Sequence, residues 1–213
     1  MGDGSASLVY PHPAPFLRGS MFDINDLIGA KYKISSHLQQ RGIADYIEGT
    51  VRDVIIARHN GRPARSKRSI EDVMVGDFTY VDIKTRDVNA DFSMPNLISI
   101  ERLRKLYIDP KNELVLIFVD YAVETEEVDS AMYSREKYAA IKSIEIRPIE
   151  SISWESMHIQ ALGKGQLQLK NAANPTKLYR LGRLQWLAQL KSESLLFIDK
   201  QIAKLCKYRE DLV

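Results

Sequence analysis

Two aspartates and a lysine in the first half of the chain have the types and spacing of a phosphodiester-cleaving site. Asp82 and Lys84 end the apolar segment 78–84, and Asp72 precedes it. Alternate side chains of a β-strand point to the same face, so we expect Asp82 and Lys84 to project together. Two carboxylates and a lysine on one sheet face are a minimal set for holding a divalent cation against a phosphodiester.

Each of these groups has a distinct expected role. Mg²⁺ prefers oxygen ligands in octahedral geometry, and we expect the carboxylates of Asp72 and Asp82 and the backbone carbonyl of Ile83 to supply them. Lys84 would lie near the attacking water, where it favours hydroxide and the developing phosphoryl charge. Glu48 precedes the motif on an expected helix, and would complete the acidic cluster or hold a second ion through water.

The turn between two short strands decides whether this cluster forms. We expect strands over 72–75 and 78–85, joined by a turn that contains Gly76. A two-residue turn sets Asp72 opposite Val81, on the wrong face, whereas a three-residue turn sets it opposite Asp82. The hypothesis therefore requires the longer turn or a β-bulge.

The remaining pattern alternates helices and strands. Apolar spacing predicts helices over 24–40, 43–58, 95–106 and 176–207, and strands over 113–121, 141–149 and 153–162. The segment 86–94 has the composition of a polar loop. This order predicts an α/β fold, in the sense of an α+β mixed sheet flanked by helices.

The composition is that of an ordinary globular chain. Its 213 residues are 45% hydrophobic, with a formal net charge of +2, which fits one domain over 21–213 behind a flexible tail at 1–20. Prolines at 11, 13 and 15 oppose an export signal, and no apolar run is long enough to span a membrane. A single cysteine allows no internal disulfide, so we expect a cytoplasmic protein without membrane association.

A basic segment follows the second predicted helix. Five cationic residues lie within eleven positions: Arg58, Arg62, Arg65, Lys67 and Arg68. Charge clustering alone is equally typical of a solvated loop and of an arm that neutralises DNA phosphates.

The order of a helix acid, a strand acid and Asp-x-Lys resembles the PD-(D/E)xK nuclease core. More specifically, Asp82-Ile83-Lys84-Thr85-Arg86-Asp87 and Met94-Pro95-Asn96-Leu97-Ile98-Ser99 resemble the catalytic strand and recognition loop of type II restriction endonucleases of the HincII kind. The more distant EcoRV kind resembles the chain in its Asp-x-Lys motif. The resemblance implies Mg²⁺-dependent hydrolysis of double-stranded DNA at a short palindromic site. It implies Asp72, Asp82 and Lys84 as catalytic residues, with Glu48 beside them.

The same resemblance implies a set of DNA contacts. Asn96 would reach base edges from the major groove, with Gln160, Gln166 and Arg86 as further contacts. The charge clustering described above adds Arg65, Lys67 and Arg68 as candidate phosphate contacts. Phe92, Ser93 and Met94 depart from the family's pattern at the recognition loop. Apolar Phe92 or Met94 could meet thymine methyl groups, which would favour an A·T-rich site.

The family also implies partners. A two-fold homodimer reads a palindrome and places one active site on each strand, and a restriction role implies a cognate DNA methyltransferase. Three other functions remain open from the residues: another PD-(D/E)xK nuclease such as a nickase or junction resolvase, a non-catalytic DNA-binding module, and an enzyme unrelated to DNA.

Overall fold

The computed structural model describes residues 22–35, 37–66, 69–90, 96–129, 134–160, 165–170 and 182–210. Its main element is a six-stranded mixed sheet in the order β1-β7-β6-β4-β3-β2. The strands are β1 (Lys31–Ile34), β2 (Arg62–Pro63), β3 (Val73–Val75), β4 (Thr79–Asp87), β6 (Glu113–Asp129) and β7 (Ser134–Pro148). Strands β4 and β6 are parallel, and the other neighbours in this sheet are antiparallel.

A smaller antiparallel sheet in the order β5-β9-β8 lies beside the main one. It consists of β5 (Asn96–Ser99), β8 (Met157–Gln160) and β9 (Gln166–Leu169). The helices are α1 (Gln40–His59), α2 (Ile100–Leu106) and α3 (Arg183–Glu210), with short 3₁₀ segments at Asn25–Leu27, Ile149–Ser151 and Trp154–Ser156. None of the described helices is apolar enough over a sufficient length to cross a bilayer.

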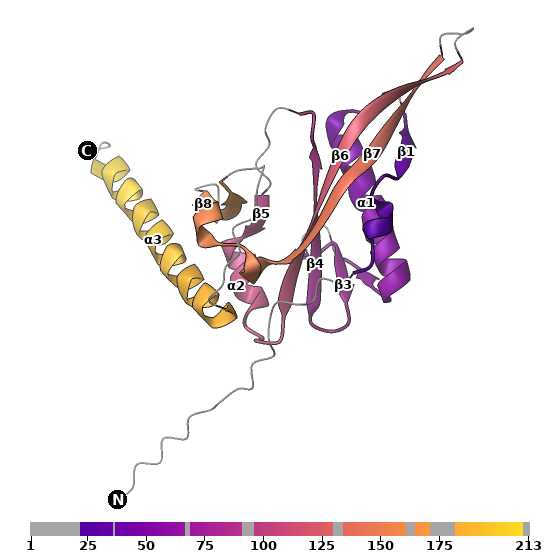
Figure 1. Ribbon diagram of the computed structural model, residues 1–213. Coiled ribbons are helices and arrows are strands. Elements are labelled where there is room, and N and C mark those ends of the chain that lie inside the picture. Colours follow the sequence, from indigo (N-terminus) through magenta and orange to yellow (C-terminus); the bar gives the residue numbers. More distant parts are fainter. Residues whose placement is uncertain are drawn as a thin grey trace, which may run out of the picture.

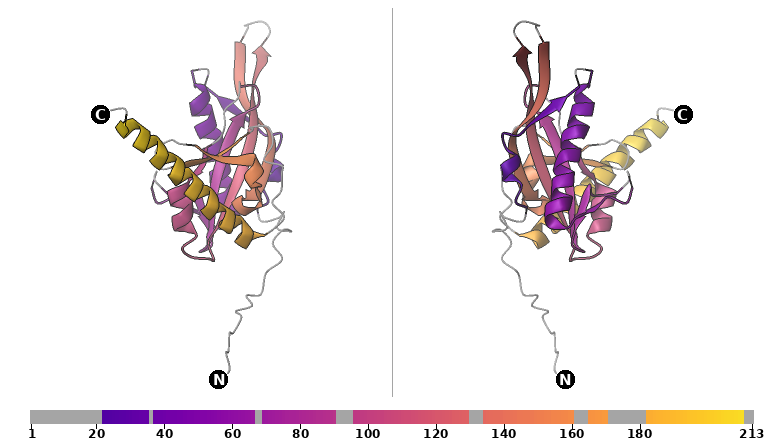
Figure 2. Two further views of the ribbon diagram at one scale, coloured as in Figure 1. Left: turned by 90° about the vertical axis from the view of Figure 1, so that its left-hand side faces the viewer. Right: turned by 90° about the vertical axis from the view of Figure 1, so that its right-hand side faces the viewer.

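Alternation along β4 and β6 divides the core into two parts. Odd-numbered residues such as Ile83 and Ile117 pack with Ile47 of α1. Even-numbered residues such as Leu116 pack with the small sheet, α2 and Trp186 of α3. Figures 1 and 2 show the result, with α1 on one side of the main sheet and the small sheet, α2 and α3 on the other. Asp82 and Lys84, being even-numbered, belong to the second face.

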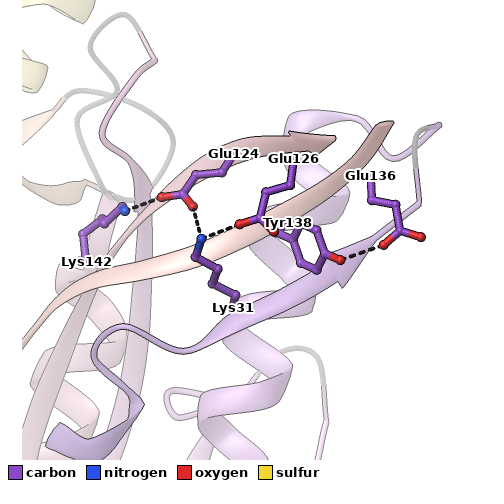
Figure 3. Close-up of polar contacts among 6 residues, drawn as sticks. All are labelled: Lys31, Glu124, Glu126, Glu136, Tyr138 and Lys142. Carbon is purple, nitrogen blue, oxygen red and sulfur yellow. Dashed lines mark hydrogen bonds and ion pairs between the residues drawn. The ribbon is translucent and has the colours of Figure 1, made fainter. Parts of the chain in front are cut away.

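The β6–β7 hairpin extends well beyond the body of the molecule (Figure 1). Its outer part carries ion pairs instead of a core, as Figure 3 shows: Lys31 Nζ lies 2.8 Å from Glu124 Oε2 and 2.5 Å from Glu126 Oε1, and Lys142 also pairs with Glu124. Lys31 comes from β1, so this network ties the edge strand to the hairpin.

The structure confirms a mixed sheet flanked by helices and corrects several element assignments. The predicted helix over 24–40 is wrong, because Lys31–Ile34 is a strand. Tyr32 and Ile34 pack on the core while Lys31 and Lys33 are exposed, so a period of two prevails over the helical spacing. The predicted second helix corresponds to α1, and β6 and β7 run further along the acidic segment 122–140 than expected.

Two further expectations are affected. The predicted helix from 95 is wrong in its first turn, because Asn96–Ser99 is a strand and α2 begins only at Ile100, with the Ser99 side chain accepting a hydrogen bond from Arg102 N. The terminal helix is present as α3, from Arg183. The predicted tail at 1–20 lies outside the described residues.

Candidate active site

A three-residue turn connects β3 to β4. The pairs Val73↔Val81 and Val75↔Thr79 leave Gly76, Asp77 and Phe78 in the turn. Gly76 has a φ of 62°, a left-handed conformation that glycine adopts without strain. The register ends at Val73↔Val81. Asp72 lies against Val81 as well, because its N–H donates to Val81 O, so a bulge brings it next to Asp82 without making the two register partners. The turn length required by the sequence hypothesis is confirmed.

Asp72 is held by two contacts to β4. Its main-chain N–H donates to Val81 O at 2.8 Å, and its Oδ2 accepts from Ile83 N at 2.7 Å. The carboxylate thus continues the ladder where β3 ends. The N–H and C=O of one strand residue point to the same side of the strand, so the Ile83 carbonyl points to the side on which Asp72 lies.

Asp82 and Lys84 form a close ion pair on one face of β4. Lys84 Nζ lies 2.9 Å from Asp82 Oδ1 and 2.8 Å from Oδ2. Asp82 is only 7% exposed, and this burial raises its pKa to about 7. Lys84 acts in the opposite direction, while the charge of Asp72 and its hydrogen bond with Asp82 raise the pKa further. The two aspartates are therefore close neighbours that compete for positive charge.

Glu48 approaches this group from α1. It follows the buried Ile47 and is half-buried. Burial raises the pKa of Glu48 to about 7; the Asp72 charge adds to this increase, and Lys84 opposes it. Since both Asp72 and Lys84 act on Glu48, all four predicted catalytic residues lie in one electrostatic neighbourhood.

The donor set fits a hard cation that is shared with a substrate. Within the described residues, no three His, Cys, Asp or Glu side chains converge closely enough to hold a metal ion unaided. Mg²⁺, however, is commonly held by one or two carboxylates, with waters and substrate phosphate oxygens as its remaining ligands. Asp72 and Asp82 would offer the carboxylates for such a cation and Ile83 a carbonyl, and the proximity of the two acids would favour its binding.

Arg86 lies two residues beyond Lys84 on the same face and is already paired. Its guanidinium contacts both oxygens of Asp120, at 2.7 and 2.6 Å, and Ser143 Oγ donates to Asp120 at 2.9 Å. Arg86 and Asp120 are direct partners in the parallel β4–β6 ladder. Sequence reasoning missed Asp120, because only the register of a strand far along the chain brings it here.

The basic segment is partly used within the protein. Arg58 pairs with Asp26 at 2.5 Å, and Arg62 donates to Gly76 O at 2.9 Å. Arg65 is exposed. Lys67 and Arg68 lie outside the described residues, as do the recognition-loop residues Phe92, Ser93 and Met94.

The three amide residues expected to contact DNA lie together on the small sheet. Asn96 pairs across β5–β9 with Gln168, and Gln160 pairs across β8–β9 with Gln166. Gln168 Nε2 donates to Asn96 Oδ1. Sequence reasoning missed Gln168, although the alternation Gln166-Leu167-Gln168-Leu169 is the signal of a strand with one polar face.

No protein-family model matches the chain, and a search of curated proteins gave no significant match.

Proposed function

We propose that this protein is a Mg²⁺-dependent endonuclease acting on double-stranded DNA. One observation carries the proposal: the three-residue turn brings the Asp72 carboxylate to Ile83 N–H on β4, between Asp82 and Lys84 in the sequence, which form an ion pair. Asp82 is buried and Asp72 is half-buried. Two adjacent carboxylates in this position repel each other, and the lysine neutralises only part of their charge. A phosphodiester bound through a divalent ion would supply the rest.

The chain's residues then have separable tasks. Asp72 and Asp82 would bind the cation, and Ile83 N–H orients the Asp72 carboxylate for this role. When bound, Mg²⁺ supplies Lewis-acid stabilisation of the phosphoryl oxygens. On binding the cation, Asp82 would loosen its ion pair with Lys84, whose ammonium would then face the attacking water. Glu48, with its pKa near neutrality, is suited to exchange a proton with water at physiological pH.

The finer proposal is a type II restriction endonuclease with the PD-(D/E)xK core. It rests on the resemblance of segments 82–87 and 94–99 to the catalytic strand and recognition loop of these enzymes. The first of these segments also contains Asp82, which lies beside Asp72 in the structure. It carries with it a palindromic site, a homodimer, a cognate DNA methyltransferase and a cytoplasmic location.

The decisive experiment incubates long unmethylated DNA with the purified protein and Mg²⁺. We expect discrete fragments that disappear with EDTA and with Asp82→Ala. Glu145→Gln is the matched control. Phe118 of β6 pairs with Lys84 on one side and with Glu145 on the other, so Glu145 lies on the same sheet face as Lys84. Like Asp82, it forms an ion pair, in this case with Arg147. Its cleavage should remain.

Other products would point elsewhere. Nicked circles alone would favour a nickase, and cutting confined to branched DNA would favour a junction resolvase. Sequence-selective binding without any cutting would reduce the site to a DNA-binding module whose Asp82 and Lys84 form a structural ion pair.

A further inference from the structure

One face of the small sheet is polar from edge to edge. The register places Asn96, Gln168 and His158 in one row across β5, β9 and β8, and Ser99, Gln166 and Gln160 in the next. The opposite face, with Leu167 and Leu169, belongs to the hydrophobic core. Polar side chains that are buried on a sheet face normally have hydrogen-bond partners.

Three buried atoms on this face lack such a partner. Gln168 Oε1, Gln160 Oε1 and His158 Nδ1 have no hydrogen-bond partner in the described structure. Gln168 is only 6% exposed, whereas Asn96 is exposed. In this row the buried Gln168 amide, whose oxygen has no partner, lies beside the exposed Asn96 amide.

The Asn96–Gln168 contact has two possible orientations. In the observed one, Gln168 Nε2 donates to Asn96 Oδ1. If both amides were reversed, Asn96 would donate and the buried Gln168 NH₂ group would lose its acceptor. Buried N–H groups without partners are rarer than incompletely satisfied carbonyl oxygens, so the observed orientation is favoured.

We propose that Gln168 is a specificity-determining residue that fixes which group Asn96 presents to DNA. Since Asn96 Oδ1 is engaged by Gln168, the exposed part of the Asn96 amide is its Nδ2 donor. In the major groove guanine presents two acceptors, N7 and O6, whereas adenine presents an acceptor and a donor. An asparagine whose oxygen is held inward by a donor and whose NH₂ group faces outward fits the two acceptors of guanine better than the acceptor and donor of adenine.

This inference rests on the proposed DNA-cleaving function, because it assigns Asn96 a base edge. It also replaces the expectation of an A·T-rich site at this one position by a guanine. Gln168 touches no base; it acts by positioning Asn96.

The test uses two substitutions that differ in what they offer Asn96. Gln168→Glu supplies only acceptors, so Asn96 must donate inward and present Oδ1 outward. Gln168→Met keeps the shape and removes both groups. Gln40→Glu makes the same chemical change at an exposed residue at the start of α1, on the other side of the main sheet. All are combined with Lys84→Met, so that selection of bound sites from a randomised DNA library proceeds without cutting.

With the Gln168 side chain unaltered, we expect guanine to be preferred at one position by roughly 5- to 100-fold. Gln168→Glu should move this preference to adenine or cytosine, whose exocyclic amino groups are donors. Gln168→Met should weaken it, and Gln40→Glu should leave it unchanged. A guanine preference that survives both Gln168 substitutions would overturn the proposal.

Hydrogen exchange of the side-chain amides, followed by NMR on the free protein, separates this inference from the proposed function. We expect protection at Gln168 Nε2 and rapid exchange at Asn96 Nδ2, with the protection transferred to Asn96 in Gln168→Glu. Protection of Asn96 Nδ2 in the unaltered protein would refute the assigned orientation. Absence of any DNA binding, with the expected amide protection, would refute the nuclease and the base assignment.

Discussion

Asp72 Oδ2 accepts a hydrogen bond from the main-chain N–H of Ile83 at 2.7 Å, on the strand that carries Asp82 and Lys84. One acid of the candidate site is thereby oriented by the backbone next to the other acid. This arrangement depends on the length of the β3–β4 turn more than on any single side chain.

Shortening the turn should separate the two acids. Deletion of Asp77 leaves two turn residues and moves Asp72 to the opposite face from Asp82. We expect cleavage to be lost, together with the increase in Tm that Mg²⁺ produces in the unaltered protein. Asp77→Asn keeps the turn length and should retain both, although it weakens the 3.5 Å contact with Arg62. A deletion variant that still cuts DNA would show that alignment is not needed.

Removal of the lysine should affect chemistry more than binding. In Lys84→Met we expect the cleavage rate to fall by about 10²–10⁴-fold, the usual contribution of a positioned proton-transfer or charge-stabilising group. DNA affinity, measured by fluorescence anisotropy, should change little. Equal losses in affinity and rate would instead identify Lys84 as a phosphate contact.

Glu48 should make stability depend on pH. Its pKa of about 7 in the folded protein lies above the ordinary value of 4.5, so its contribution is fully present below pH 4.5 and is lost as the pH rises through about 7. Glu48→Gln removes this loss. The free energy of unfolding of Glu48→Gln minus that of the unaltered protein should therefore be larger above pH 7 than at pH 4. We expect an increase on the order of 1 kcal/mol, because solvent screens a half-exposed group.

Denaturant unfolding at several pH values measures this effect. Asp53→Asn is the control, because Asp53 is an exposed carboxylate on the same helix, with its side chain 69% accessible. Parallel curves for Glu48→Gln and the unaltered protein would show that Glu48 carries no such strain.

Asn96→Ala should weaken binding to the preferred site by about 1–3 kcal/mol, the usual contribution of a good base contact. Affinity for unrelated DNA should stay constant, because phosphate contacts supply most of it. Competition binding with the preferred site and with a site altered at one base pair measures both. Unchanged discrimination would exclude Asn96 as a base-reading residue.

The hairpin network in Figure 3 should respond to acid and salt. Hydrogen bonds from Lys142 and Lys31 lower the pKa of Glu124 to about 2. Its stabilising contribution is therefore present above the ordinary value of 4.5 and is lost as the pH falls through about 2. Glu124→Gln should lower Tm near pH 7 and at low salt only, since these charges are exposed and screened. A Tm difference that persists in 1 M salt would contradict this account.

The sequence by itself was sufficient for the local parts of the site. Period-two alternation predicted that Asp82 and Lys84 share a face, and the position of Gly76 restricted the turn to two lengths, of which one aligned Asp72 with Asp82. Apolar spacing also predicted α1, and with it the place of Glu48 at the edge of a buried stripe. These features depend on neighbours within a few residues or on a single hairpin, which local patterns describe well.

Only the tertiary structure decided the contacts that join distant strands. Parallel pairing of β4 with β6 brings Asp120 to Arg86, and the small sheet brings Gln168 to Asn96 from 72 residues away. Tyr32 and Ile34 fitted a helix by spacing, yet they form a strand because β7 offers an edge to pair with. Strand register and edge pairing depend on the whole sheet, and no local pattern in this chain could specify them.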